Sequence, residues 1–426
     1  MKNEITGMKL RLIVMNFLQF AVWGAYLTSM GSYLYNIGLG AKIGLFYAMQ
    51  GVVSLFMPAV MGIIADRWVP AQKLFGFCHF MAALFMIAAG WYGYVDGEAV
   101  DFGTLFTFYS LSVAFYMPTL ALTNSVAYTA LDKVKLDPVI AFPPIRIFGT
   151  IGFICSMLLT DVLGFQTNYM QFFSCACFGV ILAAYSLTLP GCPVSRGGEK
   201  KSLVDAMGLR AFTLFKQKKM AIFFIFSMLL GVSLQITNGF ANPFLSSFKG
   251  IPEYADTFGV NHANALISLS QVSETLCILL IPFVLKHFGI KRVMLIAMLA
   301  WVLRFGLFGL GNPGSGVWMF VLSMIVYGVA FDFFNISGSL FVNNETDLSI
   351  RSSAQGLFVI MTNGIGATVG TLGAQAVVNH FVDMNSDMPQ MEGWSTTWFV
   401  FAGYALVVAV LFALIFKYKH NPGQVK

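Results

Sequence analysis

Twelve separate runs of apolar residues constrain the fold of this chain more than any other feature. Each run has about 20 residues, the length that a helix needs to cross the hydrocarbon core of a bilayer. Their centres lie near residues 24, 54, 83, 115, 153, 178, 232, 274, 301, 329, 366 and 406. A chain with 58% hydrophobic and 10% charged residues cannot hide this much apolar surface inside one water-soluble globule. We therefore predict an all-α membrane protein with twelve transmembrane helices.

The positive charges predict the orientation of these spans. When the loops are assigned alternately to the two sides of the membrane, nearly all Lys and Arg residues fall on the side that holds both termini. The exceptions are Lys42 and Lys249, which fall on the opposite side, and Arg146 and Arg304, which fall within spans. The basic side is expected to be the cytoplasm. The net charge of +6 is thus a topology signal, and no basic stripe with interleaved aromatics indicates a nucleic-acid partner.

A polar and basic segment divides the chain into two halves. Residues 190–219 begin with Pro and Gly and interrupt the apolar pattern. We predict an N-terminal six-helix half over 1–189, a cytoplasmic linker over 190–219 and a C-terminal six-helix half over 220–426. The stretch "LVDAMGLRAFTLF" within the linker is expected to lie as an amphipathic helix on the inner membrane surface. Two six-span halves are typical of a transporter.

The loop after the second span reads "GIIADRW", from Gly62 to Trp68. It resembles the loop signature of the major facilitator superfamily, whose members have six plus six spans. We expect Gly62 to allow close helix approach, and Asp66 and Arg67 to pair or to cap neighbouring helix ends. The match is partial, because Trp68, Val69 and Pro70 follow where the superfamily usually has a glycine and further basic residues. The residues of this loop therefore do not decide whether it takes part in gating between helices.

Charged residues inside spans are the first candidates for function. Charges are costly in hydrocarbon and normally face the bundle interior, a cavity or each other. The spans contain Arg146, Glu274, Arg304 and Asp332. Structural pairing is one alternative, most simply of Asp332 with Arg304 on the next helix, and Arg146 could instead snorkel to the interface.

Amide side chains occur near these charges at helical spacing. Gln235 and Asn238 are three residues apart, and so are Gln271 and Glu274. Each pair therefore projects from one face of its helix. A lone amide in a membrane span more often serves helix packing. Three amides together with a carboxylate and a guanidinium favour a water-filled cavity that binds a polar solute.

Aromatic residues add flat surfaces to this set. Arg146, Thr150 and Phe153 follow one stripe of the fifth span at i, i+4 and i+7, and Tyr327 and Phe331 share a stripe of the tenth. Amides can read the mixed donor and acceptor edge of a nucleobase, rings can stack on its faces, and a carboxylate with a glutamine can hold ribose hydroxyls. A sugar would use much of the same set, so a nucleoside, a hexose and a small glycoside all remain open.

Longer runs carry a more specific resemblance. They are "NFLQFAVWGAYLTSMGSYL", "FPPIRIFGTIGFI", "KKMAIFFIFSMLLGVSLQITN", "SQVSETL", "LSMIVYGVAFDFFNISGS", "SAQG" and "FKYKH". Through them nearly the whole chain resembles the bacterial nucleoside:proton symporter family, close to its broad-specificity nucleoside permeases. The loops "GEAVDFG" and "SDMPQMEG" depart from the family. The resemblance implies a proton-coupled importer of purine and pyrimidine nucleosides, working by alternating access in the bacterial cytoplasmic (inner) membrane.

The resemblance also implies the site residues. The substrate positions of the family fall on Arg146, Thr150, Phe153, Gln235, Asn238, Gln271, Glu274, Tyr327 and Phe331. Proton coupling is expected at Asp332 or Glu274, because a partly desolvated carboxylate binds a proton more readily than one in water. Glu274 lies one turn from Gln271 and suits a ribose ligand, whereas Asp332 lies between two phenylalanines. His79 is a remote candidate for a proton relay.

Two other functions are weighed against this one. Within the transporters the alternative is a proton-coupled sugar or glycoside symporter. A membrane-embedded transferase is more remote, because the loops are short and their acidic residues scattered. We therefore expect no enzyme activity, no cofactor and no metal, since Cys175 and Cys177 lack zinc-ligand spacing. The expected partners are nucleosides, protons and the lipid bilayer, without nucleic acid, and the expected state is a monomer.

Overall fold

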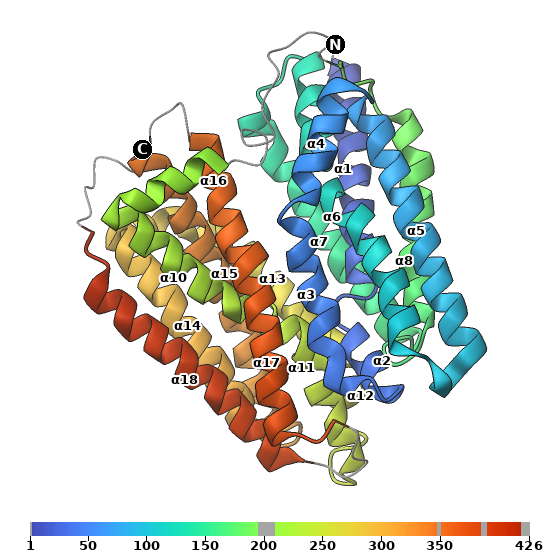
Figure 1. Cartoon of the computed structure of the whole chain (residues 1–426), viewed down its shortest axis with the longest axis vertical. Coiled ribbons are helices and arrows are strands. Elements are labelled where there is room, and N and C mark those ends of the chain that lie inside the picture. The colour runs from blue at the N-terminus through green and yellow to red at the C-terminus, as the bar shows by residue number, and fades with distance from the viewer. Residues whose placement is uncertain (1, 195–208, 347–350, 385–389, 419–426) are drawn as a thin grey trace. The chain divides into compact units, whose positions relative to one another are not determined.

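The computed structural model describes residues 2–194, 209–346, 351–384 and 390–418, and these are helical almost throughout (Figure 1). Within this described part, 11 helices are long and apolar enough to cross a membrane. A bent pair, Gly40–Ser54 with Met57–Ala65, adds a twelfth if it counts as one span. The predicted all-α class and the predicted number of spans are confirmed.

The first half of the chain contains eight labelled α-helices. They are α1 (Lys2–Gly24), α2 (Met30–Asn36), α3 (Ile43–Ser54), α4 (Met57–Arg67), α5 (Ala71–Asp96), α6 (Phe102–Lys133), α7 (Pro138–Val162) and α8 (Met170–Tyr185). Local chemistry fixes several ends. Helix α5 stops at Gly97, whose φ of +54° lies in the region that favours glycine. Asp101 caps the start of α6, because its side chain accepts a hydrogen bond from the backbone N–H of Thr104 at 2.9 Å.

The second half has the same helical character. Its helices are α10 (Lys218–Leu234), α11 (Ile236–Ser247), α12 (Phe258–Asn261), α13 (Ala263–Phe288), α14 (Ile290–Leu310), α15 (Val317–Glu345), α16 (Arg351–Val359), the π-helical η6 (Ile360–Gly366), α17 (Ala367–Phe381) and α18 (Met391–Ile415). The short 3₁₀ helix η4 (Leu209–Lys216) covers the end of the predicted amphipathic stretch. Its beginning, residues 203–208, lies outside the described residues.

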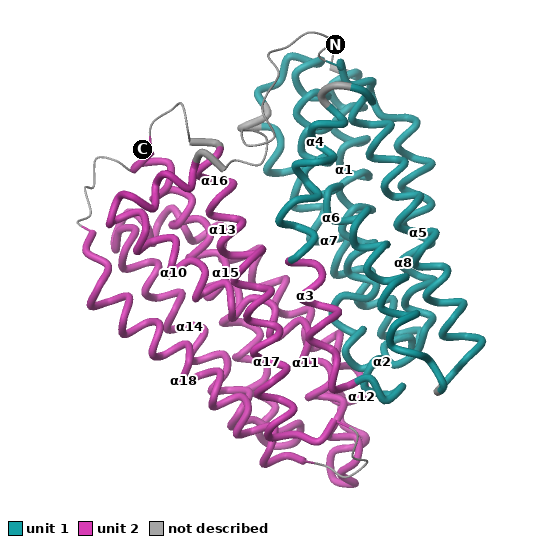
Figure 2. The backbone as a smooth tube through the Cα atoms, viewed as in Figure 1, with its two compact units in different colours: residues 1–39, 52–202 teal, residues 40–51, 203–426 magenta. Residues whose placement is uncertain are grey.

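The chain forms two compact units (Figure 2). Unit 1 comprises residues 1–39 and 52–202, and unit 2 comprises 40–51 and 203–426. The boundaries predicted at the linker remain a prediction. Residues 40–51 come from the second span but pack within unit 2, where the side chain of Gln375 accepts a hydrogen bond from the backbone N–H of Gly44 at 2.5 Å. Asn379 donates to the backbone oxygen of Ala41 at 3.2 Å.

The loop "GIIADRW" corrects one detail of the sequence interpretation. A Cβ added at Gly62 would meet no heavy atom within 4 Å. Gly62 therefore does not lie at a close helix contact with any of the described residues. The side chains of Asp66 and Arg67 fall outside the described part of the chain.

Close helix packing occurs at other glycines. In unit 1, α1 packs against α7 and α8, and α5 packs against α6 and α8. A Cβ at Gly152 of α7 would lie 2.1 Å from the backbone oxygen of Phe17 on α1. In unit 2, α10 packs against η6, and a Cβ at Gly231 would lie 2.3 Å from the backbone oxygen of Thr362. Small residues allow such close approach of transmembrane helices.

Replacement of Gly152 by Val should therefore destabilise the protein. The new side chain has no room against the α1 backbone, and overpacking of this kind typically costs about 1–3 kcal/mol of unfolding free energy. Thermal unfolding of the purified protein in detergent should show a Tm several degrees lower. Gly403→Val on α18 is the control, because a Cβ there meets nothing within 4 Å. Equal Tm shifts for the two variants would contradict the close α1 to α7 contact.

Candidate functional site

The candidates from the fifth span lie on α7 in unit 1. Arg146 is half-buried, and its guanidinium carbon lies 3.9 Å from the ring centroid of Phe20 on α1. Thr150 is also half-buried, while Phe153 is only 8% exposed. The ring of Phe153 meets Trp23 of α1 edge to face, with centroids 6.4 Å apart. The predicted stripe of α7 thus holds, and it packs beside aromatic side chains of α1.

Three aromatic neighbours of this stripe were missed in the sequence. Phe20 contacts Arg146, and Trp23 contacts Phe153. Trp23 also contacts Tyr116 of α6, with ring centroids 6.0 Å apart. Phe20 and Trp23 are three residues apart in "QFAVWG", so the same helical spacing could have found them. However, the chain has 43 Phe residues. Helical spacing alone does not distinguish an aromatic residue of the functional site from one that only packs the protein.

The amides of the seventh span lie where that span is interrupted, in unit 2. Gln235 stands between α10 and α11, and Asn238 lies in the first turn of α11. The side-chain nitrogen of Asn238 donates to the side-chain oxygen of Gln235 at 2.7 Å. Both side chains are half-buried. Their mutual bond leaves the Nε2 donor of Gln235 and the Oδ1 acceptor of Asn238 for a further partner, which is a mixed edge suited to a nucleobase.

The two carboxylates lie on helices α13 and α15, which pack against each other in unit 2. Gly328 of α15 allows this packing, because a Cβ there would lie 2.5 Å from the backbone oxygen of Ser273 on α13. Glu274 is half-buried, Asp332 is 5% exposed, and the two carboxylates interact electrostatically. Among the residues that the structure describes, no group hydrogen-bonds to Oδ2 of Asp332. The structure thus places a buried and a half-buried acidic group close enough to interact electrostatically.

Further candidates surround this carboxylate pair. Gln271 is 9% exposed and lies one turn before Glu274 on α13. Tyr327 and Phe331 stack with ring centroids 5.6 Å apart and an interplanar angle of 6°. Tyr327 also interacts electrostatically with Glu274. The α13 and α15 candidates are therefore brought into one region of unit 2.

Arg304 does not pair with Asp332. Its guanidinium donates to the backbone oxygen of Ser323 at 2.6 Å, and its Cζ lies 4.7 Å from the ring centroid of Tyr327. Arg304 is 1% exposed, and no described contact joins it to the Asp332 carboxylate. The alternative of a structural Asp332 to Arg304 pair is therefore wrong, because the guanidinium of Arg304 is directed to the backbone oxygen of Ser323 and the ring of Tyr327.

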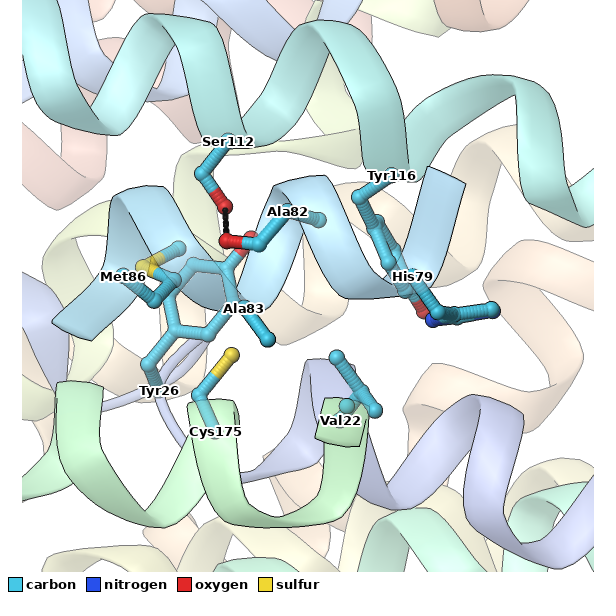
Figure 3. Close-up of a pocket in the computed structure, with 10 residues that line it drawn as sticks. Val22, Tyr26, His79, Ala82, Ala83, Met86, Ser112, Tyr116 and Cys175 are labelled. Atoms are coloured by element: carbon cyan, nitrogen blue, oxygen red, sulfur yellow. Dashed lines mark hydrogen bonds between the residues drawn. The ribbon is translucent and has the colours of Figure 1, made fainter. Parts of the chain in front are cut away.

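His79 lies in a separate hydrogen-bonded network in unit 1. Its Nε2 is 2.7 Å from the side-chain oxygen of Gln19. The side-chain nitrogen of the same Gln19 donates to the hydroxyl of Thr119 at 2.8 Å. Beside His79 is a cavity of about 10 Å³, which is lined by Tyr26, just after α1, and by residues of α1, α5, α6 and α8 that include Tyr116 (Figure 3). This volume suits roughly one water molecule and not a nucleoside. His79 is thus held within the hydrogen-bonded interior of unit 1, and a proton relay there stays a remote prediction.

The described residues contain no group of three or more His, Cys, Asp or Glu side chains that could hold a metal ion. The carboxylates of Glu274 and Asp332 come with amides and aromatic rings instead. In chemical terms the described groups can bind an uncharged polar solute with flat faces, and the acidic pair can bind and release a proton.

Comparison with known proteins gives concordant matches. A family model described as "Nucleoside H+ symporter" matches residues 6–421. The chain is 47% identical over 420 residues to a xanthosine permease of Escherichia coli, with 98% of each chain covered. It is 46% identical over 418 residues to the nucleoside permease NupG of Escherichia coli, with 97% of each covered. A crystal structure of the nucleoside transporter NupG matches with a TM-score of 0.88 and 46% identity, covering 97% of this chain and 100% of that chain.

Proposed function

The chain belongs to the nucleoside:proton symporter family, and on this premise we propose that it imports purine and pyrimidine nucleosides together with protons. It is a multi-pass membrane transporter of the major facilitator type, and its family and relatives are permeases and not enzymes. The remote alternative of a transferase is thereby excluded, and the resemblance noted in the sequence is confirmed. The family also favours nucleosides over the sugar or glycoside alternative.

The pair formed by the buried Asp332 and the half-buried Glu274 is the observation that carries the coupling proposal. Like charges that face each other in a low-dielectric environment repel strongly. A proton bound by the pair removes one of the two charges and so lowers the cost of moving the loaded site through the membrane interior. Glu274, next to Gln271, then holds ribose hydroxyls, and Asp332 takes up and releases the proton. The proton belongs to the pair wherever the two groups titrate together.

Substrate recognition is proposed at the remaining candidates. Gln235, Asn238 and Gln271 hydrogen-bond the base and the ribose, while Phe153 and Phe331 contact flat faces of the solute. Arg146, Thr150 and Tyr327 complete the set of polar and aromatic contacts. The bond between Gln235 and Asn238 supports this assignment, because it pre-orients one donor and one acceptor of the pair.

Alternating access is the proposed mode of transport. The first span of each predicted half is interrupted, between α1 and α2 at residues 25–29 and between α10 and α11 at Gln235. Interrupted helices at corresponding positions of two halves are typical of transporters with a site near the bilayer midplane. The distribution of Lys and Arg supports cytoplasmic termini in the bacterial inner membrane. The monomeric state stays a prediction.

Uptake into proteoliposomes tests the proposed function. Labelled uridine should accumulate when the outside is more acidic than the inside, and a protonophore should abolish the accumulation. Purine and pyrimidine nucleosides should compete with uridine, whereas free hexoses should not. Competition by hexoses or glycosides without competition by nucleosides would instead support the sugar symporter.

The aromatic contacts give a separate prediction. Phe153→Leu and Phe331→Leu should each raise the half-saturating uridine concentration several-fold, because an aromatic contact is worth about 0.5–1.5 kcal/mol beyond simple burial. Initial uptake rates over a range of uridine concentrations measure this effect. Phe80→Leu on α5 is the control, since that ring is 52% exposed on the apolar surface. Unchanged values for both site variants would mean that the two rings only pack the protein.

A further inference from the structure

Phe20 of α1 lies against the guanidinium of Arg146 on α7. The distance of 3.9 Å from the guanidinium carbon to the ring centroid is well within the range of about 6 Å for a cation–π contact. The ring thus lies against the centre of the guanidinium. The five N–H donors lie in the plane of the group and point from its edge. The stack therefore positions the charge without using any of its hydrogen-bond donors.

The packing of α1 against α7 creates the space for this stack. Gly149 lies three residues after Arg146, and a Cβ there would come 2.6 Å from a ring carbon of Phe20 and 2.8 Å from Nη1 of Arg146. The ring and the guanidinium can meet at this place because residue 149 has no side chain. The contact between Phe20 and Arg146 is thus part of the interface between α1 and α7.

The rotation of α1 is fixed from its other side. Gln19 is fully buried and bonded to His79 and Thr119, and the hydroxyl of Tyr116 donates to the Gln19 backbone oxygen at 2.8 Å. Successive residues of a helix point about 100° apart. The bonds to Gln19 therefore set the direction in which Phe20 projects, toward α7.

We propose that Phe20 is a positioning residue for the substrate site, because it holds the guanidinium of Arg146 in place. This proposal rests on the proposed role of Arg146 in nucleoside binding. An arginine near the end of a membrane span tends to extend its charge toward the interface. The Phe20 ring holds the guanidinium on the α7 stripe that also carries Phe153, where the proposed function places the nucleoside. Phe20 itself acts through Arg146 and needs no direct contact with the solute.

Uptake kinetics test this role. Phe20→Leu keeps an apolar side chain but removes the aromatic face, and it should raise the half-saturating uridine concentration about 3- to 30-fold, the range expected for loss of a partly desolvated cation–π contact. The maximal rate per transporter molecule should change much less. Phe20→Tyr keeps the face and should restore near wild-type kinetics. Phe17→Leu is the matched control, because Phe17 lies one turn before Phe20 on α1, and the guanidinium of Arg146 lies over the ring of Phe20.

A double-mutant cycle separates the inference from the function on which it rests. Arg146→Ala should raise the half-saturating concentration, and adding Phe20→Leu to it should change the value by less than about two-fold, because coupled residues are not additive. An equal effect of Phe20→Leu in both backgrounds would overturn the inference alone. Wild-type kinetics for Arg146→Ala would overturn the role of Arg146 and the inference together.

A third variant keeps the test decisive if Phe20→Leu fails to reach the membrane. Gly149→Ala separates the ring from the guanidinium while keeping both groups, so it should also raise the half-saturating concentration. A folded Gly149→Ala protein with wild-type kinetics would contradict the positioning role.

Discussion

Asp332→Asn should still bind uridine but lose accumulation driven by an inwardly directed proton gradient. The asparagine has nearly the same shape as the aspartate but cannot take up and release a proton. Asp332 is 5% exposed on α15, lies beside Glu274, and has an oxygen without a described hydrogen-bond partner. The substitution therefore removes the coupling group and leaves the amide and aromatic contacts in place. Of all the changes considered, this one should have the largest effect on transport.

Proteoliposomes allow binding, exchange and coupled uptake to be measured on the same preparation. The Asp332→Asn protein should exchange internal for external uridine without a pH gradient, whereas its gradient-driven uptake should fall to background. Asp256→Asn in an exposed turn is the control and should accumulate uridine normally. If Asp332→Asn accumulates uridine like the wild type and responds normally to a protonophore, Asp332 is structural. Glu274 then becomes the coupling residue, and Glu274→Gln should abolish accumulation instead.

Ala substitutions of Gln235, Asn238 and Gln271 should each weaken uridine binding. A hydrogen bond lost in a partly dehydrated site costs about 1–3 kcal/mol, which corresponds to roughly 5- to 150-fold in affinity. Gln235 and Asn238 hydrogen-bond each other, so the variant lacking both should lose less than the sum of the two single losses. Equilibrium binding of labelled uridine to purified protein measures each affinity.

An amide outside the site provides the control for this series. Asn261 at the end of α12 is exposed, and its side chain donates to the backbone oxygens of Ala255 and Thr257. Asn261→Ala should therefore leave uridine affinity unchanged. Wild-type affinity in all three site variants, with unchanged thermal unfolding, would show that the amides serve helix packing and that the nucleoside binds elsewhere.

The amino-acid sequence by itself determined the membrane class, the number of spans and the family. These features depend on local properties: the length of an apolar run, and the cost of a charge within it. Helical spacing also placed Arg146 and Phe153 on one face of α7, because residues seven apart share a face in any regular helix. The long runs shared with the nucleoside:proton symporters identified the family before any contact was known.

Tertiary structure alone decided which side chains meet. It let Glu274 and Asp332 interact electrostatically, directed Arg304 to a backbone oxygen and not to the carboxylate of Asp332, and placed Phe20 under Arg146. It also packed residues 40–51 of the second span within unit 2. These contacts join different helices, and they depend on how far each helix is rotated and how closely two backbones approach. Glycines such as Gly149 and Gly328 set those approaches, but only the packed structure reveals which glycine faces another helix, because a glycine in the sequence does not specify its neighbour.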